Sequence, residues 1–213
     1  DALPICYEIG SVGTVMPDVE VKIGENNEIL LRGKTITTGY YKKPEATAAA
    51  IDRDGWFHTG DAGYLKDSHL YLTERIKDLF KTSNGKYISP QALETKLAID
   101  RYIDQIAVIA DERKFVSALI VPVYGFVKDY AKEKGIAYSN MDELLQHPKI
   151  QALFRARIDT LQQQFAHYEQ VKRFTLLTEP FSMERGELTN TLKLKRSVVA
   201  KNYKGLIDKM YEE

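Results

Sequence analysis

The sequence predicts an α+β protein in which a β-rich subdomain is followed by a small α+β sandwich domain. Short strand-like segments separated by turn residues occur over residues 10–33 and again over residues 64–73, a pattern typical of β-hairpins. After Lys77, strand-like and helical segments are mixed, and no repeat or low-complexity tract is present. We therefore expect two domains, residues 1–76 and residues 77–213.

The first domain is expected to contain two hairpins and a short helix. Residues 19–23 alternate between valine or isoleucine and charged side chains, and a polar turn separates them from the apolar residues 29–31. Because the fixed φ of proline suits a first helical turn, Pro44 and the alanines after it predict a helix over residues 44–51. A second hairpin is expected around the polar residues 66–68.

The second domain is expected to open with a tight turn and a helix. Asn84 followed by Gly85 favours a turn that needs positive φ. Ser89 and Pro90 are suited to cap and start a helix that extends to about Ala98.

Strands and helices then alternate as far as the end of the chain. Residues 103–110 and 115–123 are rich in β-branched residues and predict two strands. One or two helices are expected over residues 126–146, a further strand over residues 174–177 and a loop over residues 178–192.

Two helices of this domain show an apolar stripe at helical spacing, which indicates packing against a core. The first carries Ile150, Leu153, Phe154, Ile158, Leu161 and Phe165. The last helix is expected over residues 197–211, with Val199, Tyr203, Leu206 and Met210 facing inward.

Composition excludes several classes of function. Lysine plus arginine total 30 and aspartate plus glutamate total 30, so no net charge favours nucleic acid as a partner. Cys6, the one cysteine, has no second cysteine for an internal disulfide, and charge or proline interrupts every apolar run. We expect a cytoplasmic protein, without a prediction about membrane association.

Asp61 is the first candidate site residue. It ends the run Gly-Trp-Phe-His-Thr-Gly-Asp, in which Gly60 lets the backbone approach a ligand closely. An ionised carboxylate can accept two hydrogen bonds from the adjacent hydroxyls of a ribose. The alternative is a turn aspartate that binds nearby backbone amides.

Lys193 is the second candidate. It lies in Thr-Leu-Lys-Leu-Lys-Arg at residues 191–196, between the predicted loop and the last helix. An ammonium group has three donors and can bridge two anions that must react with each other. Lys195 and Arg196 are interpreted as solvated or helix-end charges.

Three segments, taken in order, resemble the family of acyl- and aryl-CoA synthetases, luciferases and peptide-synthetase adenylation domains. They are residues 55–61, Glu-Arg-Ile-Lys-Asp at residues 74–78, and residues 192–196. The long segment over residues 124–186 makes the sequence most similar to the long-chain fatty acid:CoA ligase branch. In this family the start of the present sequence falls partway along the chain, so we expect a C-terminal portion that is inactive alone.

The resemblance implies an enzyme that uses ATP and Mg²⁺ to convert a fatty acid to an acyl-adenylate, and then transfers the acyl group to coenzyme A. The expected partners are the fatty acid, ATP, coenzyme A and an upstream N-terminal domain of the same chain. Lys193 would contact the reacting carboxylate and the α-phosphate, and Asp61 would bind the nucleotide ribose. No residue is expected to bind a metal.

Three further roles follow from the same resemblance. Arg75 would bind the nucleotide near its ribose and phosphate, although a surface ion pair with Glu74 or Asp78 is the alternative. Lys77 falls at the hinge of the family. Gly85 would leave room for the pantetheine arm of coenzyme A.

The sequence departs from the family at two places. An extra residue precedes Gly85, and many relatives have proline where Asn190 stands and glycine where Leu192 stands. Two other functions stay open: an adenylating enzyme that delivers the acyl group to a carrier protein, and a non-catalytic docking module with the same fold.

Overall fold

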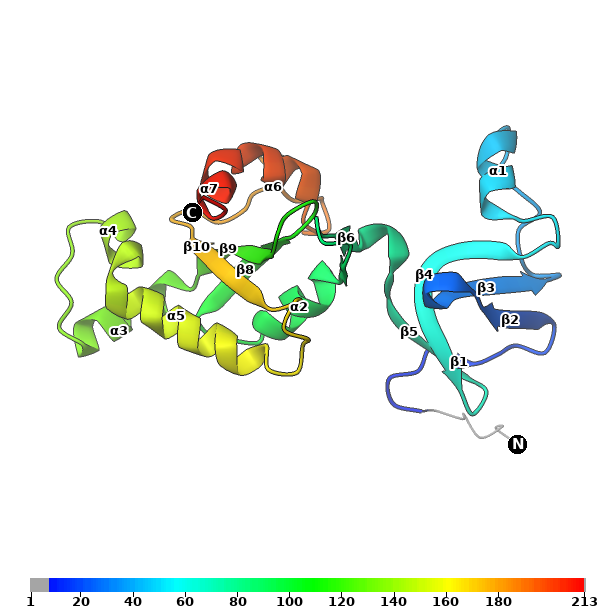
Figure 1. Cartoon of the computed structure of the whole chain (residues 1–213), viewed down its shortest axis with the longest axis horizontal. Helices are drawn as coiled ribbons and strands as arrows, with labels where there is room; N and C mark the ends of the chain where they lie inside the picture. The colour runs from blue at the N-terminus through cyan, green and yellow to red at the C-terminus, as the bar shows by residue number, and fades with distance from the viewer. Residues whose placement is uncertain (1–7, 213) are drawn as a thin grey trace. The chain divides into compact units, whose positions relative to one another are not determined.

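The chain folds into two compact units, Asp1–Leu79 and Phe80–Glu213 (Figure 1). The computed structural model describes residues 8–212 and, at positions 74 and 77, the backbone alone. Cys6 lies outside the described residues. The α+β class is confirmed, because each unit combines helices with a small sheet. The functional division into residues 1–76 and 77–213 stays a prediction.

The first unit is built on a five-stranded antiparallel sheet of order β1-β5-β4-β3-β2. Its strands are β1 (Gly13–Thr14), β2 (Val19–Ile23), β3 (Glu28–Gly33), β4 (Phe57–Lys66) and β5 (His69–Arg75). Both predicted hairpins are present, as the pairs β2/β3 and β4/β5. The predicted helix is α1 (Pro44–Ala50), and a 3₁₀ turn, η1 (Glu25–Asn27), joins β2 to β3.

The second unit contains a three-stranded mixed sheet of order β10-β9-β8. β8 (Ile103–Ile109) is antiparallel to β9 (Val116–Pro122), and β10 (Val171–Leu176) is parallel to β9. A two-stranded ribbon, β6 (Phe80–Lys81) and β7 (Tyr87–Ile88), surrounds the predicted turn. The helices are α2 (Pro90–Leu97), α3 (Tyr124–Glu133), α4 (Met141–Gln146), α5 (Pro148–Leu161), α6 (Arg196–Asn202) and α7 (Lys204–Lys209).

The sheet of the second unit separates two apolar cores. Ala118 and Ile120 of β9 pack with α2, α3 and α5, whereas Leu119 and Val121 pack with α6 and α7. Successive side chains of a strand point to opposite faces, so a strand buried on both faces must be apolar throughout. All residues of β9 are buried, and its one polar side chain, Ser117, is hydrogen-bonded to the hydroxyl of Tyr211 at 2.8 Å.

The predicted last helix is wrong in one respect. The structure has two helices, α6 and α7, separated at Tyr203, and a glycine, Gly205, follows the break. Glycine lowers helix stability, and the break changes which side chains face inward. Leu206 is therefore 37% exposed, and Ile207 is buried in its place.

Two smaller differences concern the segment before α6. Helix α5 ends at Leu161, so Phe165 packs on the core from the connection that follows the helix. β10 begins at Val171, before the predicted start of the strand. Among residues 8–212, none of the helices has both the length and the apolar character needed to span a bilayer.

Candidate functional site: an aspartate–arginine pair and a lysine turn

Asp61 lies on a bulge of strand β4. Between Glu28 and Leu30 of β3 the register shifts, and β4 carries a longer stretch, residues 58–62, opposite them. Gly60 has φ of 72° within this stretch, a conformation that favours glycine. The bulge therefore explains why a glycine precedes Asp61.

Side chains from β3 and β4 hold the bulge in place. One carboxylate oxygen of Glu28 accepts a hydrogen bond from the amide of Gly60 at 2.9 Å, and the other lies 2.9 Å from Nδ1 of His58. The hydroxyl of Thr59 donates to the carbonyl of Ile29 at 2.7 Å and accepts from the amide of Asp61 at 3.1 Å. The backbone on both sides of Gly60 is thus fixed by the neighbouring strand.

The structure brings together the two predicted nucleotide-binding residues. Asp61 and Arg75 are paired across β4 and β5, and Nε of Arg75 donates to Oδ1 of Asp61 at 2.9 Å. Their side chains are 32% and 59% exposed, so both are accessible to a ligand. The hydrogen bond to Asp61 raises the pKa of Arg75 above its usual value. Among the described residues, Oδ2 of Asp61 has no hydrogen-bond donor.

Lys193 lies on a tight turn that the sequence did not predict. Leu188 and Leu194 form an isolated antiparallel bridge, and the amide of Thr189 donates to the carbonyl of Lys193 at 2.8 Å. The hydroxyl of Thr189 also accepts from the amide of Lys193 at 3.0 Å. Within the part of the chain that the structure describes, no acceptor or carboxylate binds the exposed ammonium of Lys193.

The turn contains a residue in an unfavourable conformation. Leu192 has φ of 60° and is 67% exposed. Left-handed backbone costs about 1–2 kcal/mol for residues with a Cβ. Glycine would adopt this conformation without that cost.

Two carboxylates, one partly buried and one fully buried, anchor the base of the turn. Glu94 of α2 binds both terminal nitrogens of Arg196, at 2.5 and 2.6 Å, and also accepts from the amide of Val108 at 2.8 Å. Glu187, whose side chain is 1% exposed, is bound by Arg185 and Asn202. Arg196 was interpreted as a helix-end charge, but it is half of this bidentate pair.

The pKa of Glu187 is lowered below its usual value although burial acts to raise it. Hydrogen bonds from Arg185, Asn202 and the amide of Ser182 together outweigh the desolvation. Each of these donors favours the ionised form. The ionised carboxylate is therefore part of the structure that holds the lysine turn.

Lys77 and Gly85 both lie in turns of the backbone. Lys77 is in the 3₁₀ turn η2 (Ile76–Asp78), directly after β5. Gly85 has φ of 74°, and a Cβ added there would have no atom within 4 Å. The turn conformation alone therefore accounts for glycine at this position, and the coenzyme A role of Gly85 stays a prediction.

A comparison with known proteins decides the family. Residues 77–213 match the model for the AMP-binding enzyme C-terminal domain. The chain belongs to the AMP-binding enzyme family. Its relatives are adenylate-forming acyl-CoA ligases, so the resemblance found in the sequence is confirmed at this level.

Three curated relatives of this AMP-binding protein illustrate the similarity. Peroxisomal long chain acyl-CoA synthetase 7 of Arabidopsis thaliana is 35% identical over 96% of the chain and 32% of its own length. Long-chain-fatty-acid–CoA ligase FadD15 of Mycobacterium tuberculosis is 32% identical over 97% of the chain and 34% of its own length. Long-chain-fatty-acid–CoA ligase 5 of Rattus norvegicus is 35% identical over 89% of the chain and 28% of its own length. The chain spans about a third of the length of these relatives.

Solved structures share the fold. The adenylation domain of a carboxylate reductase from Mycobacterium chelonae has a TM-score of 0.74 at 23% identity and covers 97% of this chain and 34% of its own. O-succinylbenzoate coenzyme A synthetase of Bacillus subtilis, in complex with AMP, has a TM-score of 0.58 at 23% identity and covers 89% of this chain and 35% of its own. These similarities show that the chain has the fold of the corresponding third of such proteins.

The described residues do not form a protein site for Mg²⁺. Within residues 8–212 no group of three or more histidine, cysteine, aspartate or glutamate side chains could hold a metal ion. Mg²⁺ is commonly bound by one or two carboxylates together with substrate phosphates.

Proposed function

We propose that the chain is the C-terminal portion of a long-chain fatty acid:CoA ligase. Residues 1–76 would close the large N-terminal domain, and residues 77–213 would be the small mobile domain. The observation that carries the proposal is the Asp61–Arg75 pair, in which a partly exposed carboxylate keeps one oxygen free beside a guanidinium. In the complete enzyme, ATP and a fatty acid would give an acyl-adenylate and pyrophosphate.

In this first reaction Asp61 binds the ribose hydroxyls, and Arg75 contacts the nucleotide near its ribose and phosphate. A carboxylate that is already oriented by a partner makes charge-assisted hydrogen bonds at a lower entropic cost. Lys193 contacts the fatty acid carboxylate and the α-phosphate. Because two anions approach each other there, an ammonium group with no other partner lowers their repulsion in the transition state.

In the second reaction the thiol of coenzyme A attacks the acyl-adenylate, and AMP leaves. Lys193 and Gly85 belong to the same unit but act in different reactions. A rotation at Lys77 would present one and withdraw the other. Such a hinge needs only a few residues that can change φ and ψ, as a short 3₁₀ turn can.

The proposed cofactors and partners are ATP, Mg²⁺, coenzyme A, the fatty acid and the upstream domain. We also propose a cytoplasmic localisation. The names of two of the Arabidopsis relatives include the word peroxisomal, so the relatives do not decide this point.

The test is a pair of assays with palmitate. The complete enzyme should release pyrophosphate from ATP and palmitate, and should form palmitoyl-CoA only when coenzyme A is present. The 213-residue chain alone should release none. Saturable turnover by the chain alone would show that the essential parts have been misassigned.

The same assays separate the other two functions. A complete protein that forms the adenylate but acylates only a phosphopantetheine carrier would be a carrier-dependent adenylating enzyme. A complete protein that binds neither nucleotide nor acid would be a docking module.

A further inference from the structure

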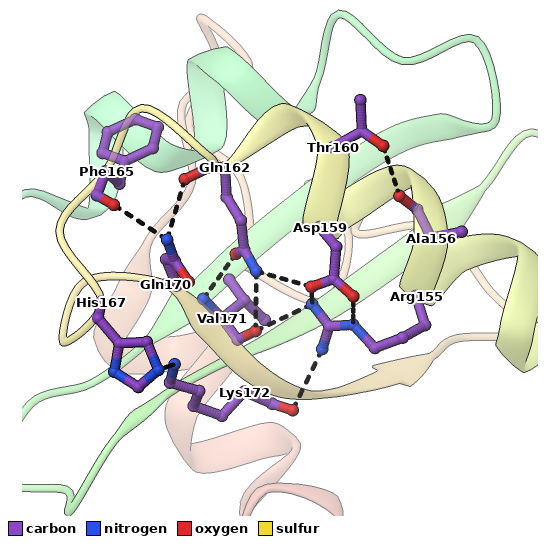
Figure 2. Close-up of polar contacts among 10 residues, drawn as sticks. All are labelled: Arg155, Ala156, Asp159, Thr160, Gln162, Phe165, His167, Gln170, Val171 and Lys172. Atoms are coloured by element: carbon purple, nitrogen blue, oxygen red, sulfur yellow. Dashed lines mark hydrogen bonds and ion pairs between the residues drawn. The ribbon is translucent and has the colours of Figure 1, made fainter.

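β10 is an edge strand whose first residues are covered by side chains. The side-chain amide of Gln162 accepts from the amide of Val171 at 2.8 Å and donates to its carbonyl at 3.4 Å (Figure 2). Arg155 donates to the carbonyls of Val171 and Lys172, at 3.0 and 3.2 Å. Gln162 and Arg155 therefore occupy the place that a neighbouring strand would take, and Asp159 holds both of them.

The rest of the same edge is open. The amide of Leu177 donates to the carbonyl of Ile120 in β9. Because residues of a parallel strand alternate between the two sides, the backbone groups of Phe174 and Leu176 point away from β9. In the described part of the chain no hydrogen-bond partner faces these groups. Unpaired edges of this kind are templates for another strand.

The open edge forms the floor of a groove within the second unit. Two hollows of about 360 and 370 Å³ meet at Phe174 and Thr175. Leu145 of α4 lines one wall, and Leu206 and Lys209 of α7 line the other. Figure 1 shows β10 between these helices. The groove is apolar near Leu145 and Leu206.

The end of the groove nearest the start of β10 is basic. Lys172, Arg173 and Lys209 line it, and none of them has a carboxylate partner among the residues that the structure describes. The guanidinium of Arg173 binds the carbonyls of Met210 and Glu212, at 2.9 and 2.6 Å, so its charge is not neutralised. The opposite end carries Asp142 and Glu179.

We propose that this groove binds an extended acidic segment of a partner protein, which adds a strand to the edge of β10. Backbone hydrogen bonds to Phe174 and Leu176 would supply affinity, and alternate side chains would supply specificity. Acidic side chains of the partner lie beside Lys172 and Lys209, and the alternate, apolar side chains face the opposite wall at Leu145. This interaction does not depend on the ligase reaction.

The test uses a synthetic peptide and the whole chain. An acetylated, amidated peptide of sequence Glu-Val-Glu-Val-Thr-Val-Thr should bind the isotope-labelled protein and shift the amide signals of Phe174 and Leu176. The same peptide with N-methylated backbone amides should not bind. The double variant Lys172→Glu, Lys209→Glu should bind about tenfold more weakly, as two attractive contacts become repulsive.

The double variant Lys128→Glu, Lys132→Glu is the matched control, because both lysines are exposed on α3 and lie outside the groove. It should bind the peptide with unchanged affinity. An equal loss in this control, or tight binding of the N-methylated peptide, would overturn the proposal in favour of nonspecific charge attraction. So would an absence of shifts at millimolar peptide. If the two signals shifted with protein concentration alone, a second copy would be the occupant and the proposal would be wrong.

Discussion

The Asp61–Arg75 pair and the lysine turn, residues 189–193, differ in whether their charged side chains have partners. In the unit Asp1–Leu79, Asp61 and Arg75 are on paired strands and bind each other at 2.9 Å. In the unit Phe80–Glu213, the turn that carries Lys193 is fixed at its base by Glu94 and Arg196, but its ammonium has no partner in the described structure.

This difference indicates two kinds of role. A pair that is oriented before the ligand arrives is suited to binding, because little order is lost when the nucleotide adds its hydroxyl groups. A cation without a partner gains most when negative charge reaches it, which favours a role in the transition state. Variants of the two regions should therefore affect binding and rate differently.

Replacement of Lys193 should have the largest effect. In the complete enzyme, Lys193→Ala should lower the rate of acyl-adenylate formation by about 10²–10³, because one electrostatic contact to the transition state is lost. Pyrophosphate release in a single turnover measures this rate. Lys195→Ala, which removes another exposed lysine nearby, should leave the rate within about twofold, since isolated surface charges contribute little.

Replacement of Asp61 should affect binding more than rate. In the complete enzyme, Asp61→Asn should raise the Kd for AMP about tenfold or more, as expected for hydrogen bonds to a charged group worth about 1.5–3 kcal/mol. Calorimetric titration with AMP measures this change. Asp18→Asn, at an exposed position before β2, is the control and should bind AMP as the unaltered protein does. Unchanged AMP affinity in Asp61→Asn would show that the carboxylate pairs with Arg75 without binding the nucleotide.

Glu187 should make the second unit sensitive to acid. Its pKa in the folded protein is below the ordinary value of 4.5, so its contribution to stability is complete above pH 4.5 and is lost as the pH falls through the lowered pKa. Glu187→Gln should reduce the free energy of unfolding by about 1–3 kcal/mol at neutral pH, because the donors around it lose a charged partner.

Circular dichroism at several pH values measures the difference in the free energy of unfolding between Glu187→Gln and the unaltered protein. This difference should become smaller below pH 4.5. Trp56, the one tryptophan of the sequence, belongs to the first unit, and its fluorescence should report an unfolding transition that the variant leaves unchanged. A difference between the two proteins that stays constant down to pH 2 would contradict the role of the ionised carboxylate.

Replacement of Leu192 should have the smallest effect. Leu192→Gly relieves left-handed strain but gives the unfolded chain more freedom, so thermal unfolding should show stability unchanged or raised by less than about 1 kcal/mol. Leu206→Gly, within α7, should lower stability, because that backbone is helical. A loss in Leu192→Gly as large as in Leu206→Gly would mean that the turn needs the leucine side chain.

Local signals in the sequence were sufficient for most of the fold. The hairpins followed from alternation and turn residues, and the cap at Ser89 followed from the preference for serine before a helical proline. The class, the family resemblance and the strands of the two larger sheets, apart from β1 and the start of β10, were predicted in this way. Asp61, Arg75 and Lys193 were also found from local motifs, although their roles stay predictions.

The contacts that position these residues could not be predicted, because they join distant parts of the chain. Glu28 holds the bulge before Asp61, and Glu94 binds Arg196 across most of the second unit. Nothing in the local sequence distinguishes these glutamates from solvated ones. The left-handed conformation of Leu192 was likewise hidden, since leucine rarely adopts it.

The most direct test of the two roles supplies the acyl-adenylate to the complete Lys193→Ala enzyme and measures single-turnover formation of acyl-CoA. If Lys193 acts only while the carboxylate and the α-phosphate react, this variant should form the thioester at the rate of the unaltered enzyme. A thioester rate that falls as far as the adenylation rate would contradict the assignment.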